Sequence, residues 1–452
     1  MKLIILVIYL LLYLNNFALA NEIYKSTAQD RVSLEVNIYN QNMALIRDVR
    51  KIHLPLGICI LYFEDVAKKI NPKTVYARSL SNPKGLSVLE QHYAYDEATS
   101  KNLLHKYIGK NIKIHIKDPE TYQEKAVEAT LLNNDVFKIG NEIYIGRPNK
   151  IILPQIPEGL FLRPTLVWLL ENSQEENLIG VSYITSDINW CADYVLIIGK
   201  NQKRGELRGW ATIDNKSGID YNNAQIKLIS MEEYQKNIEK YEPKMITQSE
   251  KRPLEYYVHK LDHITTIKDN QKKQINFFDK DINIAEKLVC CGDSSYFRSY
   301  YGMPISHENI EAYLEIENDF GIALPNGKVD IYREDKNGGL RFIGKDDIKY
   351  TPEGEKIILN LGPAFDVMIS RRQTVYRRLT TSLYEIGWEI SLENHREKPI
   401  EVIIKEPIEG DWEVISTSLP YRRINVHTLQ FAINVPANDK NEFGYQVRVR
   451  YE

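Results

Sequence analysis

Residues 31–42 have the sequence RVSLEVNIYNQN, in which apolar and polar side chains alternate before a polar turn. The apolar side chains from Val32 to Ile38 therefore lie on one face of an extended chain, because successive side chains of a β-strand point to opposite faces. The turn residues Asn40-Gln41-Asn42 favour a chain reversal. Together these features predict a half-buried strand followed by an antiparallel neighbour.

The two-residue period continues beyond this strand. A second strand is predicted at 45–54 and a third at 58–63, and the turn Pro55-Leu56-Gly57 between them predicts a β-meander. Further strands are predicted at residues 166–170, 179–185, 194–198, 207–213, 224–229, 310–316, 386–392, 400–404, 429–435 and 445–451. A helix is predicted after the N-cap Asp96, ending at Gly109. The chain is therefore predicted to be mainly β, with few helices.

Turn residues and breaks in the alternation divide the chain into segments. Residues 21–108 are predicted to form an N-terminal β-domain, 109–155 a small inserted β-barrel of five short strands, 156–370 a central β-sandwich with a polar excursion at 231–271, and 371–452 a C-terminal β-sandwich. Regularly spaced short strands are typical of immunoglobulin-like (Ig-like) sandwiches. The predicted fold class is thus a multidomain β-sandwich architecture with a small inserted barrel.

The N-terminus has the pattern of a secretory signal peptide. Lys2 precedes the apolar run Leu3–Leu14, and Ala18-Leu19-Ala20 offers a small-x-small cleavage site. The run is shorter than the roughly twenty residues that a membrane-spanning helix needs. We therefore expect residues 1–20 to be removed, leaving no integral membrane segment.

Net charge and cysteine content bear on the kind of partner and on disulfide formation. The net charge of −3 gives no electrostatic argument for binding nucleic acid. Four cysteines, Cys59, Cys191, Cys290 and Cys291, would enter an oxidising compartment, where a disulfide is permitted but not required. Their connectivity stays open, as does the oligomeric state.

Several residue patterns suggest chemistry, but each has a simpler structural explanation. His259 and His263 could bind zinc on a helix, although the apolar residues around Tyr257 favour a strand or loop. Residues 279–283 are similar to the start of a calcium loop, but Ile284 stands where that loop needs glycine. We therefore expect no metal and no cofactor.

Acidic pairs could support glycosidase chemistry, which needs two carboxyl groups. The local pairs are Asp346 with Asp347, Glu353 with Glu355, and Asp411 with Glu413. With 61 acidic residues such pairs are inevitable, so we interpret them as solvated turn residues and expect no catalytic residue. Trp190, Trp210, Trp388 and Trp412 lie in or beside alternating strands and are expected in sandwich cores.

An aromatic cluster is the best candidate for a partner contact. Tyrosine outnumbers phenylalanine 29 to 12. The cluster comprises Tyr296, Phe297, Arg298, Tyr300 and Tyr301, and Met303 follows it. Rigid amphipathic rings beside arginine are typical of recognition surfaces.

Motifs spread over nearly the whole mature chain resemble one group of bacterial exported proteins. They are Val36–Arg47, Leu54–Gly57, Asp65-Val66, Asn71-Pro72, Leu89–Gln91, Pro164–Trp168, Trp190, Ala192–Tyr194, Gly209-Trp210, Asn215, Ser217-Gly218, Leu324-Pro325, Gly354-Glu355, Asn394–Arg396 and Gly410–Trp412. The group carries the domain of unknown function 4139 and is related to mucoidy-inhibitor-A-like proteins. The resemblance implies a β-rich, exported protein. The chain departs from it at Ser230-Met231-Glu232, where a small Ala-Gly turn is expected, and it lacks the long coiled coil of the mucoidy-inhibitor-like members.

These features lead us to expect a non-catalytic envelope protein, periplasmic or secreted, that acts by binding or scaffolding. An envelope protein or a glycan is the expected partner. One alternative is a secreted hydrolase of glycan or peptide whose carboxylates converge from separate strands. A second alternative, implied only by the mucoidy-inhibitor resemblance, is a regulator of extracellular polysaccharide production.

Export should remove the first twenty residues. Mass spectrometry of the protein recovered outside the cytoplasm should find Asn21 at its N-terminus, because Leu3–Leu14 and Ala18-Leu19-Ala20 supply what a signal peptidase recognises. An exported protein that retains Met1 would contradict this prediction.

Overall fold

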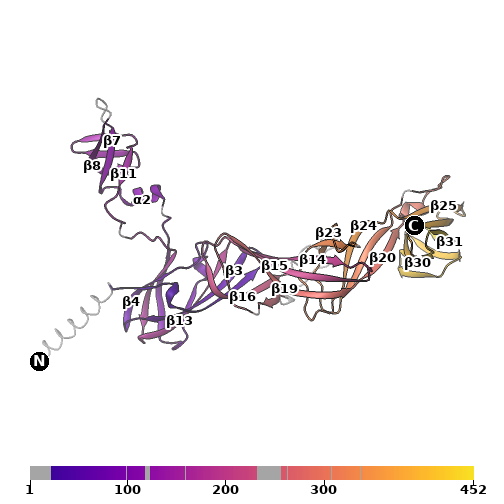
Figure 1. Cartoon of the computed structure of the whole chain (residues 1–452), viewed down its shortest axis with the longest axis horizontal. Coiled ribbons are helices and arrows are strands. Elements are labelled where there is room, and N and C mark those ends of the chain that lie inside the picture. The colour runs from indigo at the N-terminus through magenta and orange to yellow at the C-terminus, as the bar shows by residue number, and fades with distance from the viewer. Residues whose placement is uncertain are drawn as a thin grey trace. The chain divides into compact units, whose positions relative to one another are not determined.

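The computed structural model describes residues 22–97, 99–117, 123–157, 159–231, 256–261, 263–306, 308–335 and 337–451. The predicted signal peptide and residues 232–255 of the predicted polar excursion lie outside these residues. The described residues form strands β1 to β31 and the helix α2 (Ser100–Lys106), so the predicted mainly β fold is confirmed (Figure 1). Among them, no helix combines the length and the apolar character needed to cross a membrane.

Two compact units divide the chain. The first comprises Met1–Trp190 and Ile213–Lys273, and the second comprises Cys191–Thr212 and Gln274–Glu452. The three boundaries fall inside β14 (Ile188–Ile198), β15 (Arg204–Asn215) and β19 (Gln271–Asn283). The segment boundaries predicted from the sequence are different and stay predictions.

The first unit contains a sandwich of two sheets. One sheet has the order β1 (Ile23–Ser26), β4 (Gly57–Glu64), β12 (Thr165–Asn172), β6 (Leu86–Ala94); the other has β17 (Tyr256–Lys260), β16 (Tyr221–Met231), β2 (Arg31–Tyr39), β3 (Met43–His53), β13 (Glu176–Ser186), β5 (Tyr76–Ser79), with β18 (Thr265–Ile267) also paired to β16. Buried and partly exposed side chains alternate along most of β2 and β4. The Arg50 guanidinium of β3 lies 3.6 Å from the centre of the Phe63 ring of β4, so the sheets pack face to face.

The predicted β-meander is only half correct. β2 and β3 pair antiparallel, with Val36 opposite Ile46, which confirms the reversal after Tyr39. β4 does not pair with β3 and joins β1 and β12 in the opposite sheet. The turn at Pro55 therefore carries the chain between sheets, and Gly57, with a φ of +92°, adopts the conformation that favours glycine.

The insertion at 109–155 forms an open sheet and not the predicted closed barrel. Its order is β10 (Glu142–Ile145), β9 (Val136–Ile139), β8 (Glu124–Asn133), β7 (Asn111–Lys117), β11 (Lys150–Ile152). The edge strands β10 and β11 are short, and the sheet packs around Tyr107 and Phe137. The N-cap of α2 is Thr99 and not Asp96, whose carboxylate instead accepts a 3.0 Å hydrogen bond from the Phe161 N–H.

The second unit contains three sheets. Their orders are β19, β15, β14, β22 (Gly327–Glu334), β23 (Leu340–Ile348); then β24 (Lys356–Pro363), β21 (Glu311–Glu317), β20 (Ala285–Cys291), β27 (Ile400–Pro407), β30 (Thr428–Val435), β29 (Tyr421–Asn425); and β25 (Val367–Arg378), β26 (Leu383–Asn394), β31 (Asp439–Arg450), β28 (Asp411–Thr417). The last two sheets enclose a core that includes Trp388, Trp412 and Phe431. We call this pair the C-terminal sandwich.

A buried asparagine stands at four strand ends. Asn172, Asn215 and Asn394 end β12, β15 and β26, and Asn318 follows β21. None is more than 3% exposed. Each side-chain amide donates a hydrogen bond to a carbonyl no more than four residues ahead, on Gln174, Ile219, Ile322 and Lys398 respectively. The asparagines therefore fix the turns that follow their strands.

Each amide also binds a second turn that is distant in sequence. The acceptors are the carbonyls of Leu54 and Pro55 for Asn172, Lys268 for Asn215, Thr351 and Pro352 for Asn318, and Val435 and Pro436 for Asn394. For Asn172, Asn318 and Asn394, the two joined turns carry the chain between the same two sheets. We call these paired turns the crossing turns.

Replacing Asn394 should weaken the C-terminal sandwich. Asn394→Leu should lower the free energy of unfolding by about 2–4 kcal/mol, because the buried carbonyl of Val435 and the partly buried carbonyls of Lys398 and Pro436 lose their donor. Asn394→Asp should lose stability as the pH rises from about 4 to 7, since burial raises the pKa of the new carboxyl and only its protonated form can donate. Urea unfolding followed by tryptophan fluorescence measures both effects.

Asn434 is the matched control because it is exposed on β30, in the other sheet of the C-terminal sandwich. Asn434→Leu and Asn434→Asp should change the free energy of unfolding by less than about 0.5 kcal/mol. Equal unfolding midpoints for Asn394→Leu and Asn434→Leu would show that the side chain of Asn394 does not brace the turns.

Candidate functional site

The predicted aromatic cluster lies against the core of the C-terminal sandwich. A short 3-10 helix, Ser294–Phe297, begins it, and Asp293 caps this helix by accepting a 2.8 Å hydrogen bond from the Ser295 N–H. Phe297 is fully buried in the core. Its side chain therefore anchors the cluster and offers no surface to a partner.

Tyr296 and Tyr301 are only partly buried, and both rings pack on Trp388. Each ring centroid lies 5.7 Å from that of Trp388. Gln373 of β25 holds the adjoining backbone, because its side-chain oxygen accepts a 2.8 Å hydrogen bond from the Tyr301 N–H. Of the predicted contact residues, this arrangement leaves Arg298 and Tyr300 exposed.

A row of tyrosine rings continues outward from this segment through Tyr300, Tyr376, Tyr384 and Tyr451. Successive ring centroids are 6.2, 5.9 and 5.8 Å apart. The guanidinium groups of Arg298 and Arg378 lie 5.5 and 5.9 Å from the Tyr451 and Tyr384 rings. We call these four tyrosines and two arginines the tyrosine row. Within the row, the Tyr300 side chain is 72% exposed.

A groove of about 890 Å³ adjoins the row and is lined by Arg298, Tyr384 and Tyr451. Arg298 forms an ion pair with Glu409 on the groove wall. The Tyr451 hydroxyl donates a 2.5 Å hydrogen bond to the Phe297 carbonyl, and burial raises its pKa to about 12. The hydroxyl therefore remains a donor at neutral pH, which keeps the ring in place.

Buried charges lie beneath Tyr296. The fully buried guanidinium of Arg371 donates to Glu308 at 2.8 Å and to Glu406 at 3.0 Å, and it lies 4.8 Å from the Tyr296 ring centroid. Burial raises the pKa of Glu406, and the adjacent Arg371 opposes that shift. Because Arg371 is fully buried and ion-paired with both carboxylates, the cluster links β25 to the segments that carry Glu308 and Glu406.

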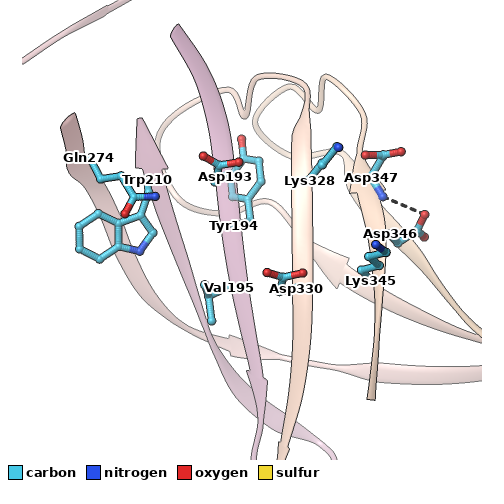
Figure 2. Close-up of a pocket in the computed structure, with 10 residues that line it drawn as sticks. All are labelled: Asp193, Tyr194, Val195, Trp210, Gln274, Lys328, Asp330, Lys345, Asp346 and Asp347. Atoms are coloured by element: carbon cyan, nitrogen blue, oxygen red, sulfur yellow. Dashed lines mark hydrogen bonds between the residues drawn. The ribbon is translucent and has the colours of Figure 1, made fainter. Parts of the chain in front are cut away.

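A second hollow, of about 900 Å³, lies on the sheet formed by β19, β15, β14, β22 and β23. Figure 2 shows Trp210 beside Gln274 at one side, with Asp193, Lys328 and Asp330 on the adjoining strands. We call it the sheet-face hollow.

Trp210 corrects the expectation that all four tryptophans lie in cores. Trp190, Trp388 and Trp412 are no more than 5% exposed, but Trp210 is only partly buried and lines the sheet-face hollow. Its neighbours explain the difference, because a Cβ at Gly209 would come within 2.3 Å of the Phe278 ring. Phe278 fills the core beneath β15, so the indole ring occupies the opposite face.

The remaining candidate groups are dispersed. His259 lies in the strand β17, and residues 279–283 lie in β19 and not in a loop. The four cysteines form no disulfide in the described part of the chain, and Cys59 and Cys290 are buried; burial raises the pKa of Cys59 to about 11. In the described part of the chain, no group of three or more histidine, cysteine, aspartate or glutamate side chains could hold a metal ion.

Sequence patterns missed most of the tyrosine row. Tyr376, Tyr384 and Tyr451 come from separate places in the chain, so no local motif joins them to Tyr300. A signal was nevertheless present in β26, where Tyr384 shares the two-residue period of the core residues Ile386 and Trp388. A tyrosine at the start of such a strand is expected at the end of the sandwich, where its hydroxyl can reach water.

No family model matches the chain, and no curated protein matches it in sequence. The resemblance to exported proteins with the domain of unknown function 4139 therefore stays a proposal.

Proposed function

We propose that the chain is an exported envelope protein, periplasmic or secreted, that acts by binding or scaffolding and not by catalysis. The observation that carries the proposal is the tyrosine row, because its rings and arginines stand beside a groove on a sandwich. The N-terminal apolar segment and the resemblance to exported proteins support the location. The proposed partner is another envelope protein.

The chemistry of the row favours a protein partner. Tyrosine and arginine are enriched at protein interfaces, where they often contribute most of the binding energy. The Arg450 side chain lines the same groove and makes no hydrogen bond or ion pair with other described residues. An acidic side chain of the partner can therefore pair with it while apolar groups cover Tyr300.

The row is also ordered before any partner binds. The Tyr376 hydroxyl donates a 3.0 Å hydrogen bond to the Arg298 carbonyl, and the Arg378 side chain donates to the Thr380 carbonyl at 3.0 Å. Side chains that are already fixed lose little conformational entropy on binding. This preorganisation favours a specific contact over nonspecific adhesion.

Removing Tyr300, the exposed tyrosine of the row, together with the nearby Met303 should weaken attachment to the envelope. In the double variant Tyr300→Ala/Met303→Ala, where both residues are at least 72% exposed, the dissociation constant for isolated envelope fragments should rise by about tenfold or more. A sedimentation assay with the purified mature protein measures it. Tyr301 is unsuitable because its ring packs on Trp388.

Phe365→Ala is the matched control. Phe365 is 89% exposed and precedes β25 at the end opposite Tyr376, so its loss should leave attachment and folding unchanged. Equal attachment of the two variants would refute the row as the contact. If Glu409→Gln instead abolished turnover of an envelope substrate while the double variant kept it, the secreted hydrolase would be the better proposal.

A further inference from the structure

We propose that the sheet-face hollow binds a neutral polysaccharide chain. This site is separate from the tyrosine row, since the two have no residue in common. The proposal does not depend on the protein partner of the row, and each surface can be tested without the other.

The strand register places polar side chains in rows across one face. Asp193 of β14 is opposite Lys328 of β22, and Lys328 is in turn opposite Asp347 of β23. In the next row Asp330 is opposite Lys345. Because residues directly opposite one another share a face of the sheet, these side chains all border the same hollow (Figure 2).

Most of these charges have no partner within the protein. The side chains of Lys328, Asp330, Lys345 and Asp347 make no hydrogen bond or ion pair with any other described residue. Figure 2 likewise marks only a bond between Asp346 and the backbone of Asp347. The face thus offers free donors and free acceptors in alternation.

The opposite side of the hollow is a fixed aromatic and polar wall. Gln274 donates a 3.2 Å hydrogen bond to the Thr212 hydroxyl, which donates to Asp193. This chain of bonds holds Gln274 beside Trp210 (Figure 2). The indole N–H of Trp210 has no hydrogen-bond partner among the described residues and is available to a ligand.

A second aromatic surface continues the face along the strands. Tyr332 of β22 follows Asp330 by two residues and is opposite Phe342 of β23, with ring centroids 5.6 Å apart. Phe342 is 57% exposed. The polar rows therefore lie between two aromatic positions, which suits a chain of several sugar rings better than one small molecule.

Polysaccharide chemistry matches these groups. Sugar hydroxyls both donate and accept, so they can satisfy lysines and carboxylates on one surface, and the apolar face of a sugar ring can cover an indole ring. Four carboxylates, those of Asp193, Asp330, Asp346 and Asp347, line the hollow with only two lysines, so the excess negative charge disfavours an acidic polymer. An added peptide strand is a poor fit, because the central strands of this sheet are already paired on both sides.

Native gel electrophoresis in dissolved polysaccharide tests the proposal with the mature protein. Hydroxyethylcellulose serves as the neutral probe and alginate as the acidic one. We expect retardation by hydroxyethylcellulose and little by alginate. Trp210→Ala should raise the dissociation constant for the neutral polymer by about tenfold or more, and Phe342→Ala should raise it less.

Tyr300→Ala is the control, since it changes the tyrosine row and should leave polysaccharide binding intact. Unchanged thermal unfolding of Trp210→Ala would show that its loss of binding is not a loss of folding. Retardation by alginate alone, by neither polymer, or equally of wild type and Trp210→Ala would overturn the proposal. Attachment of Trp210→Ala to a protein partner in the envelope should remain normal, which separates this site from the row.

Discussion

The crossing turns depend on one interaction, the hydrogen bonds of a buried asparagine side chain. Where a chain leaves one sheet for another, its backbone carbonyls lose their strand partners and still require donors. One carboxamide supplies donors to the local turn and to the distant turn together. This fixes strands that carry the functional surfaces, because β26 holds Tyr384 and ends at Asn394, and β22, which holds Lys328, follows Asn318.

Buried arginines reinforce both units in a similar way. Arg50 stacks on Phe63 and pairs with Asp48 at 2.8 Å, while Arg371 stacks on Tyr296 and pairs with Glu406. The pKa values of the two carboxyls shift in opposite directions. Burial raises the pKa of Glu406, whereas at Asp48 the effect of burial is outweighed by Arg31 and Arg50, which lower the pKa. Removing either partner would leave an uncompensated buried charge, which is strongly destabilising even where the intact pair adds little net stability.

The local parts of this fold could be predicted from sequence, and the non-local parts could not. Period-two alternation located the strands because it records which face is buried, but it does not say which strands become neighbours. Thus β4 was assigned to the wrong sheet, and the parallel pairing of β14 with β22, which creates the sheet-face hollow, was not foreseen. The aromatic cluster around Tyr300 could be predicted because its residues lie next to one another in the sequence. An acidic residue followed by asparagine recurs at Asn172, Asn215, Asn318 and Asn394, and this repeat in the sequence marks the strand ends that the buried asparagines occupy.

The spacing of the asparagine contacts has a consequence for the order of folding. Asn318 and Asn394 reach acceptors 33 and 41 residues away, whereas Asn172 reaches back 118 residues to Leu54. Loop closure costs more entropy for the longer separation, and slow folding accompanies contacts distant in sequence. The sandwich of the first unit is synthesised first, but its contact between Asn172 and Leu54 cannot form until the intervening segment has been made. The strands on either side of this contact therefore stay without their final partners while that segment emerges.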